Sequence, residues 1–339
     1  MKGRLAALVL LLVLLCGCAP QAPSGPEAAE LDRLLDAQLG KLTPLVTPEE
    51  RQAALDLLTE LQPIQTQRLE RGKYEKTSTE VNLLQELNAL YDTYTVSYLN
   101  PEEEDFGYQD PPWKTVARYD ILEDGTLTPT RPQAARAPEE PTLFALWTQI
   151  RGWLPEDAFD RFEQLTFFTD GEYETLAYAA PLDGKGMRWE FGVDPADAEE
   201  EGLFLETVLH EYFHSLTLNE EQVTYTGRQT VDTYNEDGMV SLEDSYLNAF
   251  YQAFWTDYLD DCLACEDTYN FFLRHEEDFV TPYASTDSSE DICESLTFFV
   301  LWPEQEGDAV WERKLQFFEA YPELVDFRRT VRDNLGLEA

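Results

Sequence analysis

The sequence predicts an α+β fold: a small mixed sheet over a central helix, preceded by a mainly helical N-terminal region and followed by a helical C-terminal lobe. Three observations support this fold class. Apolar residues recur at helical spacing between residues 31 and 96. Short β-prone segments then gather between residues 165 and 193. A proline-free, mostly apolar stretch from Glu199 to Leu218 follows them, as is typical of a buried central helix.

The N-terminus predicts export and a lipid anchor. Basic residues precede an apolar run of about 11 residues, which matches a secretory signal and is shorter than the roughly 20 residues of a membrane span. The following Leu15-Cys16-Gly17-Cys18 resembles the bacterial lipobox, and the small Gly17 makes Cys18 the expected lipidation site. An ordinary signal peptide that contains cysteines is the alternative. The expected protein is extracytoplasmic and anchored to a bacterial membrane as a lipoprotein.

Composition divides the chain into four parts. Residues 1–17 are the expected signal peptide, and residues 18–30, rich in Ala, Pro, Ser and Gly, are the expected flexible tether. Residues 31–138 form a mainly helical region, and residues 139–339 form a second, larger domain. The Pro- and Ala-rich stretch from Arg131 to Pro141 separates these two parts.

Local signals predict elements in the N-terminal region. Thr47-Pro48-Glu49-Glu50 is a capping box with proline at the first helical position, so a helix should begin there. A second helix should begin at Ser78 or Thr79 and run to about residue 96. Asp124-Gly125 lies between two β-prone runs within residues 118–130, which predicts a hairpin.

The central part of the chain changes from helices to strands. Helices are expected over residues 142–153 and about 156–164. Strands are expected over residues 165–168, 175–180 and 187–193, the last two joined by the turn Asp183-Gly184-Lys185-Gly186.

Charge and cysteine content restrict the functional classes. The formal net charge of −43 argues against nucleic-acid binding and against electrostatic docking on anionic lipids. Cys262 and Cys265 are spaced C-x-x-C and Cys293 stands alone. In an exported protein one pair of these could form a disulfide, and a structural role is favoured. A zinc knuckle would need two further ligands, and none is nearby.

The predicted central helix carries His210-Glu211-Tyr212-Phe213-His214. Positions i and i+4 lie one turn apart on the same helix face, so both imidazoles can reach one metal ion. Glu211 projects beside them, where it can take a proton from a metal-activated water. This is the HExxH pattern of zinc-dependent peptidases, with His210 and His214 as ligands and Glu211 as the base.

A zinc site of this type needs a third protein ligand. His275 is the only other histidine, but its surroundings are strongly polar and suggest a solvent-facing residue. Glu290 and Glu294 are i and i+4 on a helix that Asp287 or Ser288 can cap. One carboxylate can bind zinc while the other accepts the N–H of a ligating histidine. A solvated surface pair is the alternative, which the apolar segment after Glu294 disfavours.

These residues resemble a known pattern. The chain is similar to the gluzincin peptidases, most closely to the anthrax lethal factor protease domain and its relatives, which carry HExxH followed by Y-x-x-T-N-x-x-E-x-x-x-E. This sequence has Tyr283, Thr286, Asp287 in place of Asn, Glu290 and Glu294. The resemblance implies a zincin-like fold over about residues 175–300. It also implies Glu290 as the Zn²⁺ ligand, Glu294 as its hydrogen-bonding neighbour, and Tyr283 as the oxyanion donor.

The same segment departs from the pattern in two ways. The stretch between His214 and Glu290 is longer than in the toxin, and Tyr212-Phe213 replaces the Phe-Gly common inside the motif. The short segments Leu216–Asn219 and Ser245–Asn248 also resemble segments of uncharacterised bacterial lipoproteins that are described as zinc metallopeptidases.

The resemblance implies zinc-dependent hydrolysis of peptide or protein substrates. One alternative is an inactive zincin scaffold that acts as a binding or assembly lipoprotein, although the intact Glu211 argues against it. The other is a zinc amidase of the cell wall, which uses similar ligands but usually a different spacing.

Overall fold

The computed structural model describes residues 26–99, 113–130, 140–171, 175–225, 228–236, 238–259 and 268–338. The expected signal peptide, Cys18, Cys262 and Cys265 lie outside these residues. Within them the protein is α+β, with a small mixed sheet and a helical C-terminal part, which confirms the predicted fold class at this level. No helix of the described residues has the length and apolar character needed to cross a membrane.

The α-helices and strands, in chain order, are α1 (Pro26–Leu39), α2 (Pro48–Glu70), α3 (Ser78–Tyr98), β1 (Lys114–Ile121), β2 (Leu127–Pro129), α4 (Glu140–Trp153), β3 (Phe162–Thr169), β4 (Ala177–Pro181), β5 (Trp189–Val193), α5 (Glu201–Thr217), β6 (Val223–Thr224), β7 (Asn235–Glu236), β8 (Met239–Ser241), α6 (Tyr246–Phe254), α8 (Thr268–His275), α9 (Ser288–Leu301), α10 (Val310–Phe317) and α11 (Pro322–Leu335).

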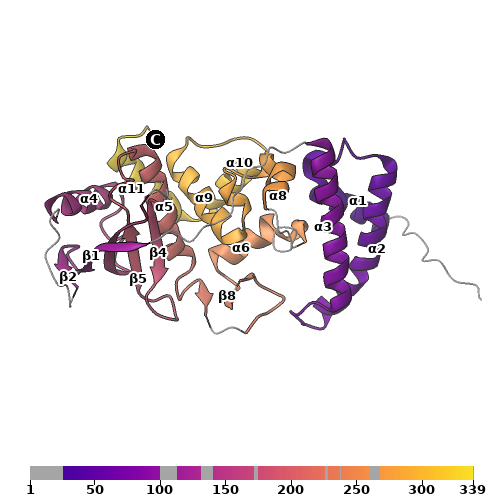
Figure 1. Ribbon diagram of the computed structural model, residues 1–339, viewed down its shortest axis with the longest axis horizontal. Helices are drawn as coiled ribbons and strands as arrows, with labels where there is room; N and C mark the ends of the chain where they lie inside the picture. The colour runs from indigo at the N-terminus through magenta and orange to yellow at the C-terminus, as the bar shows by residue number, and fades with distance from the viewer. Residues whose placement is uncertain are drawn as a thin grey trace, which may run out of the picture.

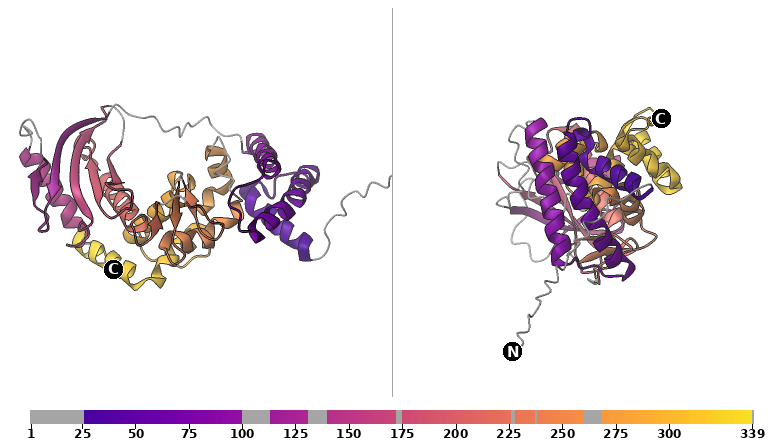
Figure 2. Two further views of the ribbon diagram at one scale, coloured as in Figure 1. Left: turned by 90° about the horizontal axis from the view of Figure 1, so that it is seen from below. Right: turned by 90° about the vertical axis from the view of Figure 1, so that its right-hand side faces the viewer.

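The parts of the molecule follow one another along its long axis. The sheet with α4 and α5 lies at one end, α6, α8, α9 and α10 lie in the middle, and the bundle α1–α3 lies at the other end (Figure 1). A view turned by 90° shows the same order (Figure 2). Two hydrophobic cores correspond to this arrangement, one inside the α1–α3 bundle and a larger one extending from the sheet through the C-terminal helices.

The main sheet has the order β2-β1-β3-β5-β4. Only β3 and β5 run parallel; the other neighbours are antiparallel. The strand predictions and the hairpin around Asp124-Gly125 are confirmed, and Gly125 adopts φ 73° in its turn, which favours glycine. β4 is an edge strand that packs against α5, so the free edge of the sheet lies beside the HExxH helix.

Several predicted boundaries differ from the structure. The helix expected at about 156–164 is a series of turns that leads into β3, because Phe162 already pairs with Trp189 of β5. Residues 26–30, expected as part of the tether, begin α1. β1 and β2 precede residue 138 but belong to the main sheet; the division at 138/139 itself stays a prediction.

Two helices of the N-terminal bundle, α2 and α3, begin with side-chain caps. The capping box at Thr47 and Glu50 is confirmed. Thr77, rather than Ser78 or Thr79, caps α3 by accepting the N–H of Glu80. Glu80 also receives the guanidinium of Arg68 at 2.9 Å, so its buried carboxylate is paired.

A buried ion pair ties α9 to α10. Lys314 Nζ lies 2.6 Å from Asp291 Oδ2, and both side chains have no solvent exposure. Trp255 Nε1 and Ser295 Oγ also donate to the Asp291 carboxylate. Burial raises the pKa of Asp291 and lowers that of Lys314, because desolvation penalises both charges.

Removing Lys314 is therefore expected to be costly. Lys314→Met leaves a buried carboxylate without its cation and should lower the free energy of unfolding by about 3–5 kcal/mol. Lys314 holds down the pKa of Asp291, so its removal raises the pKa of this buried carboxyl further, and the variant must bury an unpaired charge once the pH exceeds that pKa. The destabilisation in urea unfolding should accordingly be larger at about pH 8 than at about pH 5. An equal loss at both pH values would contradict this account.

Candidate metal centre

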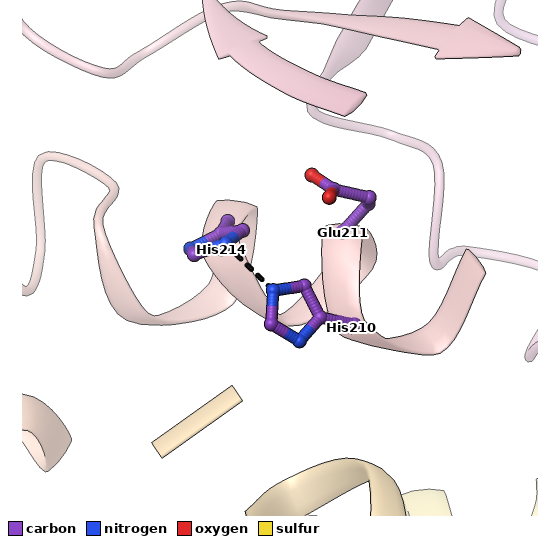
Figure 3. Close-up of side chains that lie close together, drawn as sticks. All are labelled: His210, Glu211 and His214. Carbon is purple, nitrogen blue, oxygen red and sulfur yellow. Dashed lines mark hydrogen bonds between the residues drawn. The ribbon is translucent and has the colours of Figure 1, made fainter. Parts of the chain in front are cut away.

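Helix α5 carries both motif histidines on one face. Phe204, Val208 and Phe213 are fully buried on its other faces, which fixes the rotation of the helix against the core. The two imidazoles consequently meet one turn apart, with Nε2 of His210 3.0 Å from Nε2 of His214 (Figure 3). The same view shows Glu211 on the side of the helix nearer the strands of the sheet, and one of its carboxylate oxygens lies within 4.8 Å of a ring nitrogen of each histidine.

Helix α9 brings the carboxylates to this face. Asp287, one of the two predicted caps, accepts the N–H groups of Ser289 and Glu290. Helix α9 therefore begins at Ser288. Glu290 then lies in the first turn and Glu294 one turn later. α5 and α9 pack directly against each other, so residues some 76 positions apart (290 − 214) meet in one site.

Three donor atoms converge. Glu290 Oε2 lies 3.0 Å from His210 Nε2 and 3.3 Å from His214 Nε2, and the two nitrogens are 3.0 Å apart. Ligands at 2.0–2.1 Å from a tetrahedral zinc ion are separated by about 3.3 Å, so the triangle has the dimensions of three ligands around one such ion. The donor set of two imidazoles and one carboxylate also suits zinc chemically.

Further side chains orient the ring of His210. Its Nδ1 lies 2.7 Å from Glu294 Oε1, and Thr281 Oγ1 donates to the other oxygen of Glu294 at 2.5 Å. Because the carboxylate accepts at Nδ1, the lone pair of Nε2 is free to face a metal ion. Glu294 thus has the position expected of a carboxylate that supports a ligating histidine.

A cysteine supports His214 in the same way. Thr217 donates its hydroxyl proton to the carbonyl of Phe213, so its oxygen can accept from the Cys293 thiol 3.7 Å away. The thiol then accepts from His214 Nδ1 at 3.4 Å. Because Nδ1 of His214 carries the proton in this chain of hydrogen bonds, the lone pair of its Nε2 is free to face a metal ion. Cys293 is buried and not in a disulfide.

The carboxylates favour positive charge at the site. Burial alone would lower the pKa of His210, but its hydrogen bonds to Glu290 and Glu294 outweigh burial and raise the pKa to about 10. Burial likewise opposes ionisation of Glu290, yet His214 and His210 hold the pKa of its carboxyl well below the ordinary value. Without metal the histidines therefore hold protons, and a cation that binds here displaces them.

Glu211 is held by the edge strand. Ala179 N–H of β4 donates to Glu211 Oε2 at 2.7 Å, which leaves the second oxygen able to take a proton. Complete burial raises the pKa of Glu211, while His214 and His210 oppose the rise.

A cavity of about 840 Å³ opens over His210 and Glu211, with Tyr283 and Glu290 in its wall. The ring centroid of Tyr283 lies 5.7 Å from that of His210. Desolvation and the charges of Glu290 and Glu211 raise the pKa of the tyrosine, so it stays a hydroxyl donor.

The structure brings together His210, Glu211, His214, Tyr283, Glu290 and Glu294. His275 is elsewhere, as expected, but it is not solvent-facing. Its ring is 2% exposed, packs against Tyr258 and Phe271, and lies 3.3 Å from Asp278. Sequence reasoning missed Cys293 and Thr281; the signal for Cys293 is its i+3 spacing from Glu290, which puts it on the same helix face.

Comparisons with protein-family models, curated proteins and solved structures gave no match.

Proposed function

We propose that the protein is a zinc-dependent peptidase of the gluzincin type, with His210, His214 and Glu290 as zinc ligands. The observation that carries the proposal is the triangle of Nε2, Nε2 and Oε2 atoms with sides of 3.0–3.3 Å. The supporting contacts of Glu294 and Cys293 strengthen it, because metal-binding histidines are usually held through their second nitrogen. The match to the gluzincin pattern at Tyr283, Glu290 and Glu294 agrees with this geometry.

Bound zinc would supply a Lewis acid that polarises a carbonyl and lowers the pKa of a water molecule. Glu211, oriented by the Ala179 amide, takes the proton of that water and passes it to the leaving amine. Tyr283, kept protonated by its surroundings, donates a hydrogen bond to the developing oxyanion. His210 and His214 would be neutral when a metal ion is bound, because the ion would take the place of their protons.

The edge strand offers a place for an extended substrate. In the antiparallel pair, Leu176 and Leu182 form hydrogen bonds toward the β5 side, so the alternate residues Ala177 and Ala179 direct their backbone groups outward. Because the N–H of Ala179 is already donated to Glu211, a substrate strand would use the backbone of Ala177 and the carbonyl of Ala179. Ala177 lines the cavity. A peptide can therefore add as a further strand along β4, with its scissile bond near Glu211. This zincin-like arrangement favours peptides over compact small substrates.

The N-terminal sequence supports an extracytoplasmic setting. A signal peptide with lipidation at Cys18 would tether the catalytic part to a bacterial membrane and would expose it to peptide substrates outside the cytoplasm. Palmitate labelling of the chain expressed in a bacterium, with Cys18→Ala as control, tests the anchor.

Digestion of a peptide library by the zinc-loaded protein tests the activity. Cleavage that stops when zinc is removed and resumes when one equivalent is restored would support the proposal. A zinc-loaded protein that cleaves no peptide would contradict it and would favour the inactive scaffold. Release of amines from cell-wall fragments, with peptides left intact, would favour the amidase.

Cys293 gives a separate prediction about zinc affinity. Cys293→Ala removes the acceptor of the buried His214 Nδ1–H and should weaken zinc binding by roughly 10–100-fold. Cys293→Ser retains a hydroxyl acceptor and should lose less. Competition with a chromogenic chelator measures both variants. An unchanged affinity in Cys293→Ala would show that the thiol merely fills space.

A further inference from the structure

A second group of potential metal ligands lies outside the histidine site. Asp170, Asp194 and Asp197 each contribute a carboxylate oxygen, and these oxygens lie within 4.8 Å of one another. Asp170 and Asp194 are 0% and 1% exposed, whereas Asp197 is partly buried. Two oxygens on opposite sides of one Ca²⁺ ion are about 4.6–5.2 Å apart, so the group has a span that one ion can bridge.

The strand order explains why these residues meet. β3 and β5 are parallel neighbours, and Asp170 and Asp194 directly follow them, so both lie at the same edge of the sheet. Asp170 N–H donates to Asp194 Oδ2 at 3.2 Å, and Thr175 N–H donates to Asp170 Oδ2 at 3.0 Å. Asp194 Oδ1 accepts the N–H of Ala196 at 2.8 Å. The cluster is thus built into the connections of the sheet.

Within the part of the chain that the structure describes, Asp170 and Asp194 have no cationic partner. Asp170 Oδ1 is buried and has no hydrogen-bond partner. In the described ranges, no lysine, arginine or histidine forms an ion pair with Asp170 or Asp194. Buried carboxylates are normally paired or bound to a metal, because the cost of removing them from water is several kcal/mol per ion. A buried carboxylate oxygen without a hydrogen-bond partner, on a residue that belongs to a group of three carboxylates, favours the binding of a cation.

We propose that Asp170, Asp194 and Asp197 bind a divalent cation with oxygen-ligand chemistry, namely Ca²⁺. The group contains neither imidazole nor thiolate, which separates it from zinc chemistry. Mg²⁺ keeps most of its water and usually takes one or two carboxylates, whereas Ca²⁺ accepts six to eight oxygens, including bidentate carboxylates. This inference rests on the acidic cluster alone and does not depend on the proposed peptidase function.

The site would stabilise one end of the edge strand. Asp170 holds Thr175 through its backbone, and Asp194 N–H donates to the carbonyl of Leu176 at 2.9 Å, immediately before β4. Thr175, Leu176 and Ala177 line the cavity over His210 and Glu211. A Ca²⁺ ion bound here would therefore hold the start of the strand that flanks that cavity.

Thermal unfolding with added CaCl₂ tests the site. The full chain is stripped with chelator, reloaded with one equivalent of zinc and titrated with Ca²⁺. The midpoint temperature should rise with Ca²⁺ concentration, because a ligand bound only to the folded state stabilises it by mass action. Asp170→Asn should lose this rise, and isothermal calorimetry should show the same loss of Ca²⁺ binding.

Three variants make the result specific. Asp308→Asn removes one exposed carboxylate that belongs to neither site and should respond like wild type. His210→Ala removes a zinc-site histidine and should also keep the Ca²⁺ response. Asp197→Asn, at the partly buried position, weakens Ca²⁺ binding even if Asp170→Asn fails to fold. Absence of Ca²⁺ binding in wild type, or an undiminished response in both Asp170→Asn and Asp197→Asn, would overturn the proposal.

Discussion

Glu211→Gln is expected to lower kcat for peptide cleavage by roughly 10²–10⁴-fold, the usual contribution of a general base. The amide keeps the size of the side chain but cannot accept the proton of the attacking water. It can still interact with its neighbours, although the hydrogen bond from Ala179 N–H at 2.7 Å must then end on a neutral oxygen. Since Glu211 is not one of the proposed ligands, zinc content should stay at the wild-type level.

Glu206→Gln is the matched control. Glu206 also lines the cavity on α5, but it lies one turn before His210 and its carboxyl is only partly buried. The same loss of one charge should leave kcat within about tenfold of wild type. Steady-state kinetics on one cleaved peptide compares the two variants. If Glu211→Gln remains as active as Glu206→Gln, Glu211 is not the base.

Glu290→Ala is expected to abolish stoichiometric zinc binding. The substitution removes the carboxylate whose oxygen completes the triangle with the two imidazoles and leaves a two-histidine site. Glu294→Ala should retain zinc but bind it roughly 10–100-fold more weakly, because His210 then loses the acceptor that fixes its ring. Elemental analysis after dialysis against a graded zinc buffer distinguishes these two outcomes.

Comparing the loss of zinc binding in the two variants tests which glutamate is the ligand and which one supports His210. Greater loss in Glu294→Ala than in Glu290→Ala would reverse the two roles. Unchanged zinc content in both variants would remove the basis for the gluzincin assignment. Circular dichroism of each variant confirms that α9 still folds, which is expected because Asp287 and the Lys314–Asp291 pair anchor it independently.

The local half of the site was predictable from the sequence. His210, Glu211 and His214 belong to one helix, and helical geometry alone brings i and i+4 together. The pair Glu290 and Glu294 was predicted from its helical spacing, and only the resemblance to a known pattern assigned Glu290 as the ligand. Packing of α9 on α5, which brings Glu290 to the histidines, has no local signal. The contacts from Ala179 to Glu211 and from Thr281 to Glu294 depend on tertiary structure and have no sequence signal.

The fold shows the same division between local and long-range information. The capping box at Thr47 predicted α2, the Asp124-Gly125 turn between β-prone runs predicted the β1–β2 hairpin, and short β-prone segments predicted β3 to β5. The expected helix at about 156–164 was wrong because pairing of Phe162 with Trp189 overrides its local helical pattern. His275 was wrongly expected in solvent because its acidic neighbours hid an aromatic environment contributed by Tyr258 and Phe271. Asp170 and Asp194 meet only because β3 and β5 are parallel neighbours, which the sequence does not specify.

A crystal structure of the zinc-loaded chain, with anomalous data collected on both sides of the zinc absorption edge, tests the central claim most directly. The account predicts one strong peak at roughly 2.0–2.1 Å from Nε2 of His210, Nε2 of His214 and a carboxylate oxygen of Glu290, with Glu294 on Nδ1 of His210. A zinc peak bound through Cys293 or Glu294 instead, or no peak between the histidines, would contradict it.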